Sequence, residues 1–237
     1  MENTYYKQLV RSVSDGDKCL AILIDPDKFD DRASEAFLKK IPETTTHLFV
    51  GGSTVNNNAT QTTIKALKRY TTLPIFIFPG DFTQVTPEAH ALLFLSLLSG
   101  NNPEYLIGQH IKAIPKLRGL SLEVIPTGYL LIDGGNESAV ARVTNTLPLL
   151  QENPNHIIDT ALAAQYMGMK LVYLEAGSGA NNPVHPEIIK AVKNEISIPL
   201  IVGGGIKTER QKKEALEAGA DMIVMGTAFE NQEESNV

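Results

Sequence analysis

Short apolar segments recur along this chain, and longer segments with helical periodicity separate them. Several of the apolar segments are apolar and β-branched on both faces, as buried parallel strands tend to be. This alternation predicts a parallel sheet wound with helices. We expect eight strands, near Cys19–Ile24, His47–Val50, Ile75–Phe78, Leu92–Leu97, Leu122–Ile125 (with or without Tyr129–Ile132), Leu171–Glu175, Leu200–Val202 and Met222–Met225.

The segments between the strands predict helices, and the clearest are Thr54–Tyr70, Pro154–Met167, Pro186–Glu195 and Thr208–Ala218. Gly219 follows the last of these, where a helix C-cap is expected. Eight strands with interleaved helices favour closure into an α/β (β/α)₈ TIM barrel. A length of 237 residues suits one such domain, spanning residues 1–237. Within residues 98–150 the element boundaries stay open, because two Asn- and Gly-containing turns interrupt the pattern.

Composition excludes several classes of protein. Apolar residues make up 43% of the chain and charged residues 20%, which is the balance of a globular protein. A net charge of −6 argues against broad electrostatic attraction to nucleic acid or to an anionic membrane surface, since either would favour clustered Lys and Arg. The longest apolar run, Ala89–Leu98, is far below the roughly 20 residues of a membrane span. Met1–Val10 does not read as a secretory signal, so we expect a cytoplasmic location. The one cysteine, Cys19, is expected to be a buried thiol, and the five histidines show no zinc spacing.

Acidic side chains follow the first predicted strand, in the sequence Asp25-Pro26-Asp27-Lys28. The catalytic face of a barrel lies where its strands end, so these carboxylates are expected at that face. Magnesium is usually held by one or two carboxylates together with substrate phosphate oxygens. An Asp-Pro turn that caps the next helix explains the same residues, and the motif alone does not decide between the two.

The second predicted strand ends in Gly51-Gly52-Ser53-Thr54. Glycines before a helix N-terminus favour anion binding, because they leave backbone N–H groups accessible. A plain helix N-cap at Ser53 or Thr54 is an equally good local interpretation.

The sixth predicted strand ends in the stretch 173–179, Tyr-Leu-Glu-Ala-Gly-Ser-Gly. Strand alternation places Tyr173 and Glu175 on one face. A carboxylate that points into a barrel is costly unless it is paired, hydrated or functional. We therefore predict that Glu175 is a general base, with a structural acid as the alternative. Ser178 does not complete a Gly-x-Ser-x-Gly motif, so a nucleophilic serine is disfavoured.

Glycine clusters end the last two predicted strands, Gly203-Gly204-Gly205 and Gly226-Thr227. The loops after strands seven and eight are the usual phosphate site of a TIM barrel. The two clusters together predict phosphate binding. They do not fit G-x-G-x-x-G, which disfavours a dinucleotide site.

Taken in order, these five motifs closely resemble the geranylgeranylglyceryl phosphate synthase family, in its archaeal-like group with bacterial members. The resemblance implies a transferase of phospholipid (ether lipid) biosynthesis that joins sn-glycerol-1-phosphate to a polyprenyl diphosphate. It implies Mg²⁺ held by Asp25 and Ser53, with Glu175 as the base and Tyr173 orienting it. It further implies a homo-oligomer, a dimer or hexamer, and transient membrane contact for product release. The glycerol phosphate is expected against Tyr173, Leu174, Glu175, Ala176, Gly177, Ser178, Gly179, Gly204, Gly205, Gly226 and Thr227.

The prenyl tail needs an apolar groove, for which ordinary barrel core is the alternative interpretation. The candidates are Phe76, Phe78, Phe82, Phe94, Leu97 and Leu98. Only eight residues follow Phe229, so the last helix is expected to be short or absent. Two other functions remain open from the residues alone. A phosphosugar isomerase or synthase would use the phosphate loops without a metal-bound diphosphate. A catalytically silent, phosphate-sensing barrel would not need Glu175.

Overall fold

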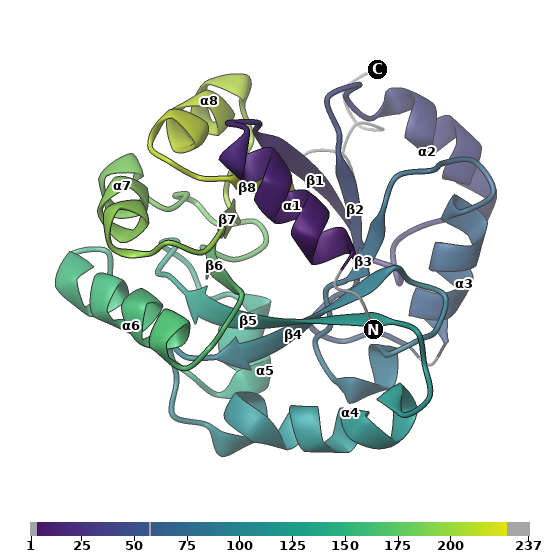
Figure 1. Cartoon of the computed structure of the whole chain (residues 1–237), viewed down its shortest axis with the longest axis horizontal. Coiled ribbons are helices and arrows are strands. Elements are labelled where there is room, and N and C mark those ends of the chain that lie inside the picture. The colour runs from purple at the N-terminus through teal and green to yellow at the C-terminus, as the bar shows by residue number, and fades with distance from the viewer. Residues whose placement is uncertain (1–3, 57, 227–237) are drawn as a thin grey trace.

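The computed structural model describes residues 4–56 and 58–226, and within them eight strands close into a parallel barrel. Each strand pairs with the next in chain order, and β8 pairs with β1, which confirms the predicted fold (Figure 1). The strands are β1 (Cys19–Ile24), β2 (His47–Val50), β3 (Ile75–Ile77), β4 (Ala91–Leu97), β5 (Glu123–Leu131), β6 (Leu171–Glu175), β7 (Leu200–Gly203) and β8 (Met222–Met225).

Helices surround this barrel. The α-helices are α1 (Thr4–Ser14), α2 (Ser34–Lys40), α3 (Ala59–Leu67), α4 (Gln109–Leu117), α5 (Ala139–Thr144), α6 (Pro154–Tyr166), α7 (Pro186–Glu195) and α8 (Glu209–Glu217). Short helical turns are η1 (Asp31–Ala33), η2 (Phe82–Gln84) and the π-helical turn η3 (Glu104–Gly108). The β3–β4 connection, residues 78–90, is fully described and holds only η2, which leaves the ends of β3 and β4 without a covering α-helix.

Two element boundaries differ from the sequence prediction for identifiable reasons. β5 runs unbroken from Glu123 to Leu131, although Pro126 has no N–H to donate and normally argues against a central strand. The Pro126 carbonyl still accepts a hydrogen bond from the Lys170 N–H at 2.8 Å. Helix α3 starts at Ala59 and not at Thr54, because Asn58 adopts the left-handed conformation with φ 67°. Residues 51–56 therefore lie in a loop at the barrel mouth.

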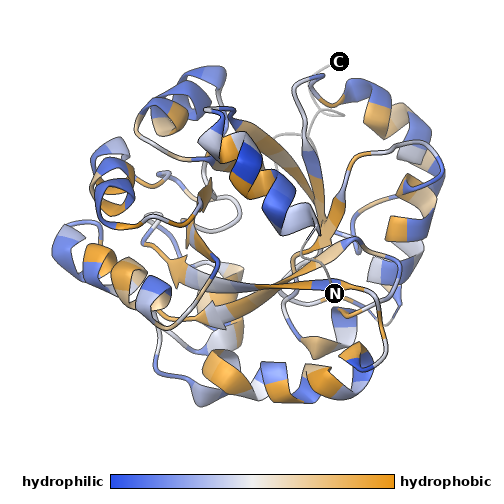
Figure 2. Ribbon diagram, in the orientation of Figure 1, coloured by the Kyte–Doolittle hydropathy of each residue, from blue (hydrophilic) through white to orange (hydrophobic). Residues whose placement is uncertain are grey.

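Apolar side chains fill two layers, one inside the barrel and one between the strands and the helices. Figure 2 shows the hydrophobic residues concentrated along the strands. The interior layer includes Phe49, Phe76 and Tyr173. Cys19 belongs to this layer and is buried, as predicted. Within the described residues, no helix is both long and apolar enough to cross a membrane.

Helix α1 closes the barrel at the amino ends of its strands, on the side facing the viewer in Figure 1. The backbone N–H groups of Tyr5 and Tyr6 donate to the Glu123 carboxylate at 2.8 and 3.0 Å. Leu9 packs into the interior layer. With this end closed, the carboxyl ends of the strands form the accessible mouth of the barrel.

Candidate active site

A cleft of about 440 Å³ opens at the carboxyl ends of the strands. All eight strand ends or the loops that follow them contribute to this mouth or to the groove beside it. Its polar and charged lining residues are Asp25, Lys28, Ser53, Thr54, Tyr129, Glu137, Arg142, Tyr173, Glu175, Ser178 and Lys207. The cleft therefore brings together side chains that are separated by up to 182 positions in the chain.

Glu175, at the end of β6, is only 6% exposed and lines this cleft. The Gly177 N–H donates to its Oε1 at 2.8 Å, which fixes the orientation of the carboxylate. Burial raises the pKa of the Glu175 carboxyl, while the Tyr173 hydroxyl and the Gly177 N–H partly counteract this rise. A carboxylate that is buried, held in place and more basic than usual is suited to accept a proton.

Two tyrosines flank this carboxylate inside the barrel. Tyr173 and Tyr129 face each other in the β5–β6 register, with ring centroids 5.4 Å apart. Burial first, and then the nearby charge of Glu175, raise the pKa of both phenols, so they stay protonated. The Tyr173 hydroxyl is buried and makes no well-aligned hydrogen bond within the described residues. It faces the Glu175 carboxylate, whose pKa it lowers, and it can donate either to that carboxylate or to a bound molecule.

Three glycines that follow the neighbouring strands β7 and β8 offer backbone N–H groups to the cleft. Gly204 and Gly205 both lie in the left-handed region, with φ of 79° and 70°, and Gly226 follows β8. The N–H groups of these three residues have no acceptor within residues 4–56 and 58–226. Gly205 is also buried, and a buried donor normally has a partner. The arrangement is suited to hold a phosphate.

The N-terminus of α8 is not part of this donor set. The Thr208 hydroxyl accepts from the Gln211 N–H at 3.2 Å, and the Gln211 side chain accepts from the N–H groups of Lys207 and Thr208. This reciprocal capping box occupies the N–H groups of Lys207, Thr208 and Gln211 internally. Anion binding at this corner therefore depends on the glycine N–H groups and the Lys207 side chain, which lines the cleft.

Asp25 and Asp27 have different partners, although only one residue separates them. Asp25 lies in the cleft, where its Oδ2 is 3.1 Å from the Lys28 amine. The Asp27 carboxylate instead accepts the Asn56 N–H at 3.0 Å and so anchors the loop after β2. Asp25 is the carboxylate available to a ligand, and Asp27 has a structural contact.

Ser53 lines the cleft together with Asp25, and a Cβ added at the neighbouring Gly52 would be 3.4 Å from Asp25 Oδ1. Within the described residues, no group of three or more His, Cys, Asp or Glu side chains could hold a metal. One carboxylate and one hydroxyl fit a magnesium ion that takes most of its ligands from substrate phosphates and water. They do not fit an all-protein metal site.

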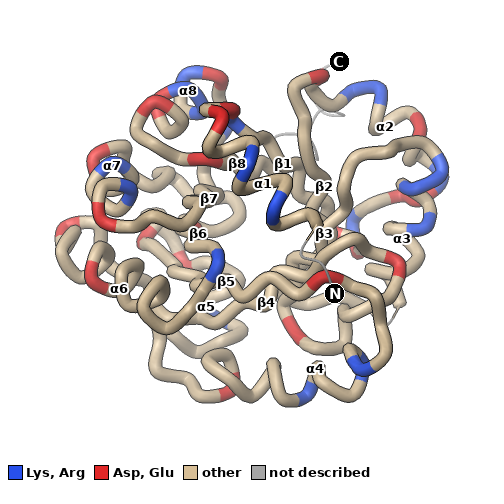
Figure 3. The backbone as a smooth tube through the Cα atoms, in the orientation of Figure 1, with Lys and Arg blue, Asp and Glu red and all other residues tan. Residues whose placement is uncertain are grey.

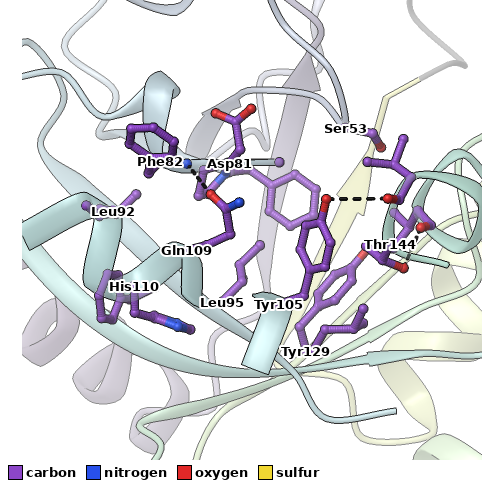
Figure 4. A pocket seen from close by; sticks show the side chains of 18 of the residues that line it. Ser53, Asp81, Phe82, Leu92, Leu95, Tyr105, Gln109, His110, Tyr129 and Thr144 are labelled. Atoms are coloured by element: carbon purple, nitrogen blue, oxygen red, sulfur yellow. Dashed lines mark hydrogen bonds between the residues drawn. The ribbon is translucent and has the colours of Figure 1, made fainter. Parts of the chain in front are cut away.

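An apolar groove adjoins the cleft and shares Gly52, Ser53, Phe78 and Tyr129 with it. Residues of the β3–β4 connection line the groove, and so do Gln109, His110 and Ala113 of α4; Figure 4 labels Gln109 and His110 among the lining side chains. Four residues predicted for a prenyl groove line it, namely Phe78, Phe82, Phe94 and Leu97. The other two do not line it: Phe76 lies inside the barrel, and Leu98 packs against the layer between strands and helices.

The predicted phosphate-site residues divide by position. Tyr173, Glu175, Ser178, Gly179, Gly204, Gly205 and Gly226 line the cleft. Leu174 and Ala176 point into the layer between strands and helices, and Gly177 supports Glu175 through its N–H. Thr227 and the predicted short or absent last helix lie outside the described residues. Tyr129, Arg142 and Lys207 also line the cleft and were not predicted.

Adding a methyl group at Gly204 tests this geometry. A Cβ there would overlap Glu175 Oε1 and the backbone nitrogens of Ala176 and Gly177. We expect Gly204→Ala to lower turnover by about 10²-fold or more, because displacement of a catalytic group by about 1 Å has that effect. Gly168→Ala is the control, since Gly168 also has positive φ (89°) but nothing lies near its Cβ position. Equal turnover of both variants in a steady-state assay would contradict the proposed arrangement.

Comparisons of this chain with a family model, with curated proteins and with solved structures agree on the family. The model of the PcrB family matches residues 17–237. The chain is 55% identical over 216 residues to a geranylgeranylglyceryl phosphate synthase of Zunongwangia profunda, covering 91% of this chain and 92% of that protein. It is 50% identical to the synthase of Flavobacterium johnsoniae, with 96% and 94% covered. A Thermoplasma acidophilum (S)-3-O-geranylgeranylglyceryl phosphate synthase, solved with its substrate sn-glycerol-1-phosphate, superimposes with a TM-score of 0.87. That pair is 37% identical, and 95% of this chain and 91% of the other are covered.

Proposed function

The chain belongs to the PcrB family, and from this membership we propose that it is a geranylgeranylglyceryl phosphate synthase. It joins the 3-hydroxyl of sn-glycerol-1-phosphate to a polyprenyl diphosphate and releases diphosphate. The expected polyprenyl diphosphate is geranylgeranyl diphosphate. The reaction makes an ether bond and belongs to phospholipid biosynthesis. Neither a phosphosugar isomerase nor a silent phosphate sensor gains support from these relatives.

One observation carries the proposal for the site. The oriented carboxylate of Glu175 lies in the same cleft as the open glycine N–H groups and Asp25. An acceptor phosphate held by Gly204, Gly205 and Gly226 would leave its glycerol chain in the middle of the cleft. The hydroxyl at the far end of that chain would then meet Glu175.

The proton and electron changes follow from this placement. As the allylic C1–O bond to diphosphate breaks, the electron pair leaves with the diphosphate oxygen. The glycerol 3-oxygen forms the new bond to C1, and its proton passes to the Glu175 carboxylate. The Tyr173 hydroxyl is proposed to donate to the 3-oxygen or to the base and so align the two. Holding both reactants in one cleft supplies much of the rate enhancement.

We propose Mg²⁺ as the cofactor, bound by Asp25 and Ser53. When bound, it neutralises charge on the departing diphosphate. The Lys28 amine, 3.1 Å from Asp25 Oδ2, and the Arg142 side chain add positive charge to the lining of the cleft. Arg142 also pairs with Glu137 at 3.2 Å, which limits where its guanidinium group can lie. These side chains orient the diphosphate toward the groove.

The prenyl chain is proposed to lie in the apolar groove between β4 and α4. Its lining is almost entirely carbon from Phe78, Phe82, Leu92, Phe94, Leu95 and Leu97. Tyr129 and Ser53 belong to both the groove and the cleft. The reacting end of the chain would therefore reach the cleft beside Glu175, while its apolar tail is removed from water.

A direct assay tests the function. The protein is incubated with Mg²⁺, either sn-glycerol-1-phosphate or its mirror isomer, and prenyl diphosphates of several lengths, and the lipid products are identified by mass. We expect one ether product from sn-glycerol-1-phosphate, formed in proportion to the diphosphate released. No ether product with any prenyl length, or equal use of both isomers, would contradict the proposal. The homo-oligomeric state and the cytoplasmic location stay predictions.

A further inference from the structure

Helix α4 and the preceding turn η3 carry an exposed apolar stripe on their outer surface. Ile107, Ile111 and Ile114 are 54%, 64% and 41% exposed. Their spacing of four and three residues places them on one side of the helix. None of them lines the groove or the cleft, so the proposed reaction does not explain them. We call these three side chains the isoleucine stripe.

The charge around the isoleucine stripe is mostly positive. Lys112, Lys116 and Arg118 lie on or next to α4, and the sequence from 105 to 122 contains no acidic residue. Glu104, at the start of η3, is an acidic neighbour and pairs with the Lys112 amine. Figure 3 shows basic segments along α4. The whole chain has a net charge of −6, so this region differs from the average surface. A helix with exposed apolar residues flanked by basic ones is the pattern of a segment that lies in a membrane interface.

The same helix forms the outer wall of the apolar groove. Gln109, His110 and Ala113 line the groove from the inner side of α4. The Lys116 amine donates to the Thr83 carbonyl at 2.8 Å and lies 5.8 Å from the centre of the Phe82 ring, another groove residue. The stripe and the groove are therefore two sides of one rigid wall.

We propose that the isoleucine stripe and its basic residues dock this protein on an anionic lipid bilayer, which places the prenyl groove at the membrane surface. The docking surface serves a lipidic substrate and product and so rests on the proposed function. A bilayer fits better than a second copy of the chain. A two-fold symmetric contact would face α4 with itself and bring basic residues against basic residues.

Vesicle flotation tests the proposal on the full chain without substrates. The vesicles contain either phosphatidylcholine alone or phosphatidylcholine mixed with phosphatidylglycerol. We expect binding to the mixed vesicles to exceed binding to the neutral ones by about tenfold or more, because each basic residue at an anionic surface contributes about fivefold. Added salt should reduce this difference. Equal or absent binding to the two vesicle types would overturn the proposal.

Matched variants locate the surface. Ile111→Ser with Ile114→Ser should lower the fraction bound to mixed vesicles by at least about fivefold, from the loss of buried apolar area. Arg118→Gln should weaken binding to mixed vesicles only. The control is Tyr166→Ser with Met167→Ser, which alters side chains 79% and 65% exposed at the end of α6. Equal loss in the control, or unchanged binding in the isoleucine variant, would place the contact elsewhere.

Two further measurements distinguish membrane docking from the proposed function and from a contact between copies of the chain. Turnover of a short, water-soluble allylic diphosphate in vesicle-free buffer should be the same in the isoleucine variant and the unmodified protein. Product formation without vesicle binding would overturn the docking surface and leave the proposed function standing. Sedimentation should give the same particle mass for both proteins. A lower mass for the isoleucine variant would instead make the stripe an interface between copies and overturn the proposal.

Discussion

Glu175→Gln is expected to lower kcat by about 10²- to 10⁴-fold, the usual contribution of a positioned general base. The amide keeps the shape of the carboxyl and can still accept the Gly177 N–H, which now donates to Oε1 at 2.8 Å. It cannot take the proton of the 3-hydroxyl. Calorimetric titration should therefore show sn-glycerol-1-phosphate binding within a few-fold of the unmodified protein. Unchanged turnover would remove Glu175 from the mechanism.

The pH dependence gives an independent check on the same residue. Burial raises the pKa of the Glu175 carboxyl above 4.5, and only its ionised form can act as the base. We expect kcat to fall as the pH decreases through this raised pKa, and Glu175→Gln to lose that acidic limb from its residual activity.

The raised pKa of Glu175 also predicts how Glu175→Gln affects the free energy of unfolding. The unfolded chain releases the Glu175 proton at a lower pH than the folded protein does. Between these two pKa values the folded state binds more protons, so the group makes the free energy of unfolding fall as the pH rises. At neutral pH, Glu175→Gln should leave the free energy of unfolding unchanged or higher in a denaturant titration. A marked loss of stability would indicate a structural role.

Asp25→Asn is expected to lower kcat/KM for the prenyl diphosphate by about 10²-fold or more, the typical effect of removing one preorganised contact to developing charge. The amide is a weaker ligand for Mg²⁺, and the Lys28 amine loses its anionic partner at 3.1 Å. The half-saturating Mg²⁺ concentration should rise, while sn-glycerol-1-phosphate binding should stay within a few-fold, because its phosphate is proposed to bind the glycine N–H groups and not the Asp25 carboxylate.

Asp27→Asn is the matched control for this change. The Asp27 carboxylate accepts the Asn56 N–H at 3.0 Å, and the amide oxygen of asparagine can still accept it. We expect its Mg²⁺ titration to resemble that of the unmodified protein. Turnover of Asp25→Asn that stays normal and survives a chelator would reject the metal assignment.

Much of the barrel could be predicted, because most strands are short apolar runs that end in glycine or acidic residues. β6 and β8 were predicted with the bounds that the structure shows. β5 was divided in the prediction, since Pro126 and Gly128 read as breaks, whereas pairing on both sides keeps the strand continuous. The start of α3 was misplaced because a left-handed asparagine, Asn58, is not evident from periodicity.

The sequence predicted those site residues that directly follow a strand. It missed those that reach the cleft only through the pairing of strands or the packing of a helix. Asp25, Glu175 and the glycines after β7 each follow a recognisable apolar run. Tyr129 lies within β5, and it reaches the cleft only because the register sets it opposite Tyr173. Arg142 comes from α5, which lies within residues 98–150, where the sequence leaves the element boundaries open. A positive charge on a short helix is the only sequence feature that could have indicated its place in the cleft. Such residues need a known register before they can be assigned.

The central claim is that one cleft holds the acceptor phosphate on the glycine N–H groups, the magnesium diphosphate near Asp25, and the Glu175 carboxylate within reach of the glycerol 3-hydroxyl. A crystal structure with sn-glycerol-1-phosphate, Mg²⁺ and an unreactive prenyl thiolodiphosphate tests this most directly. We predict the glycerol 3-hydroxyl within about 3 Å of the Glu175 carboxylate, the phosphate on Gly204 and Gly205, and the metal on Asp25. A phosphate bound beside Lys28 and Arg142, with the 3-hydroxyl directed away from Glu175, would contradict the account.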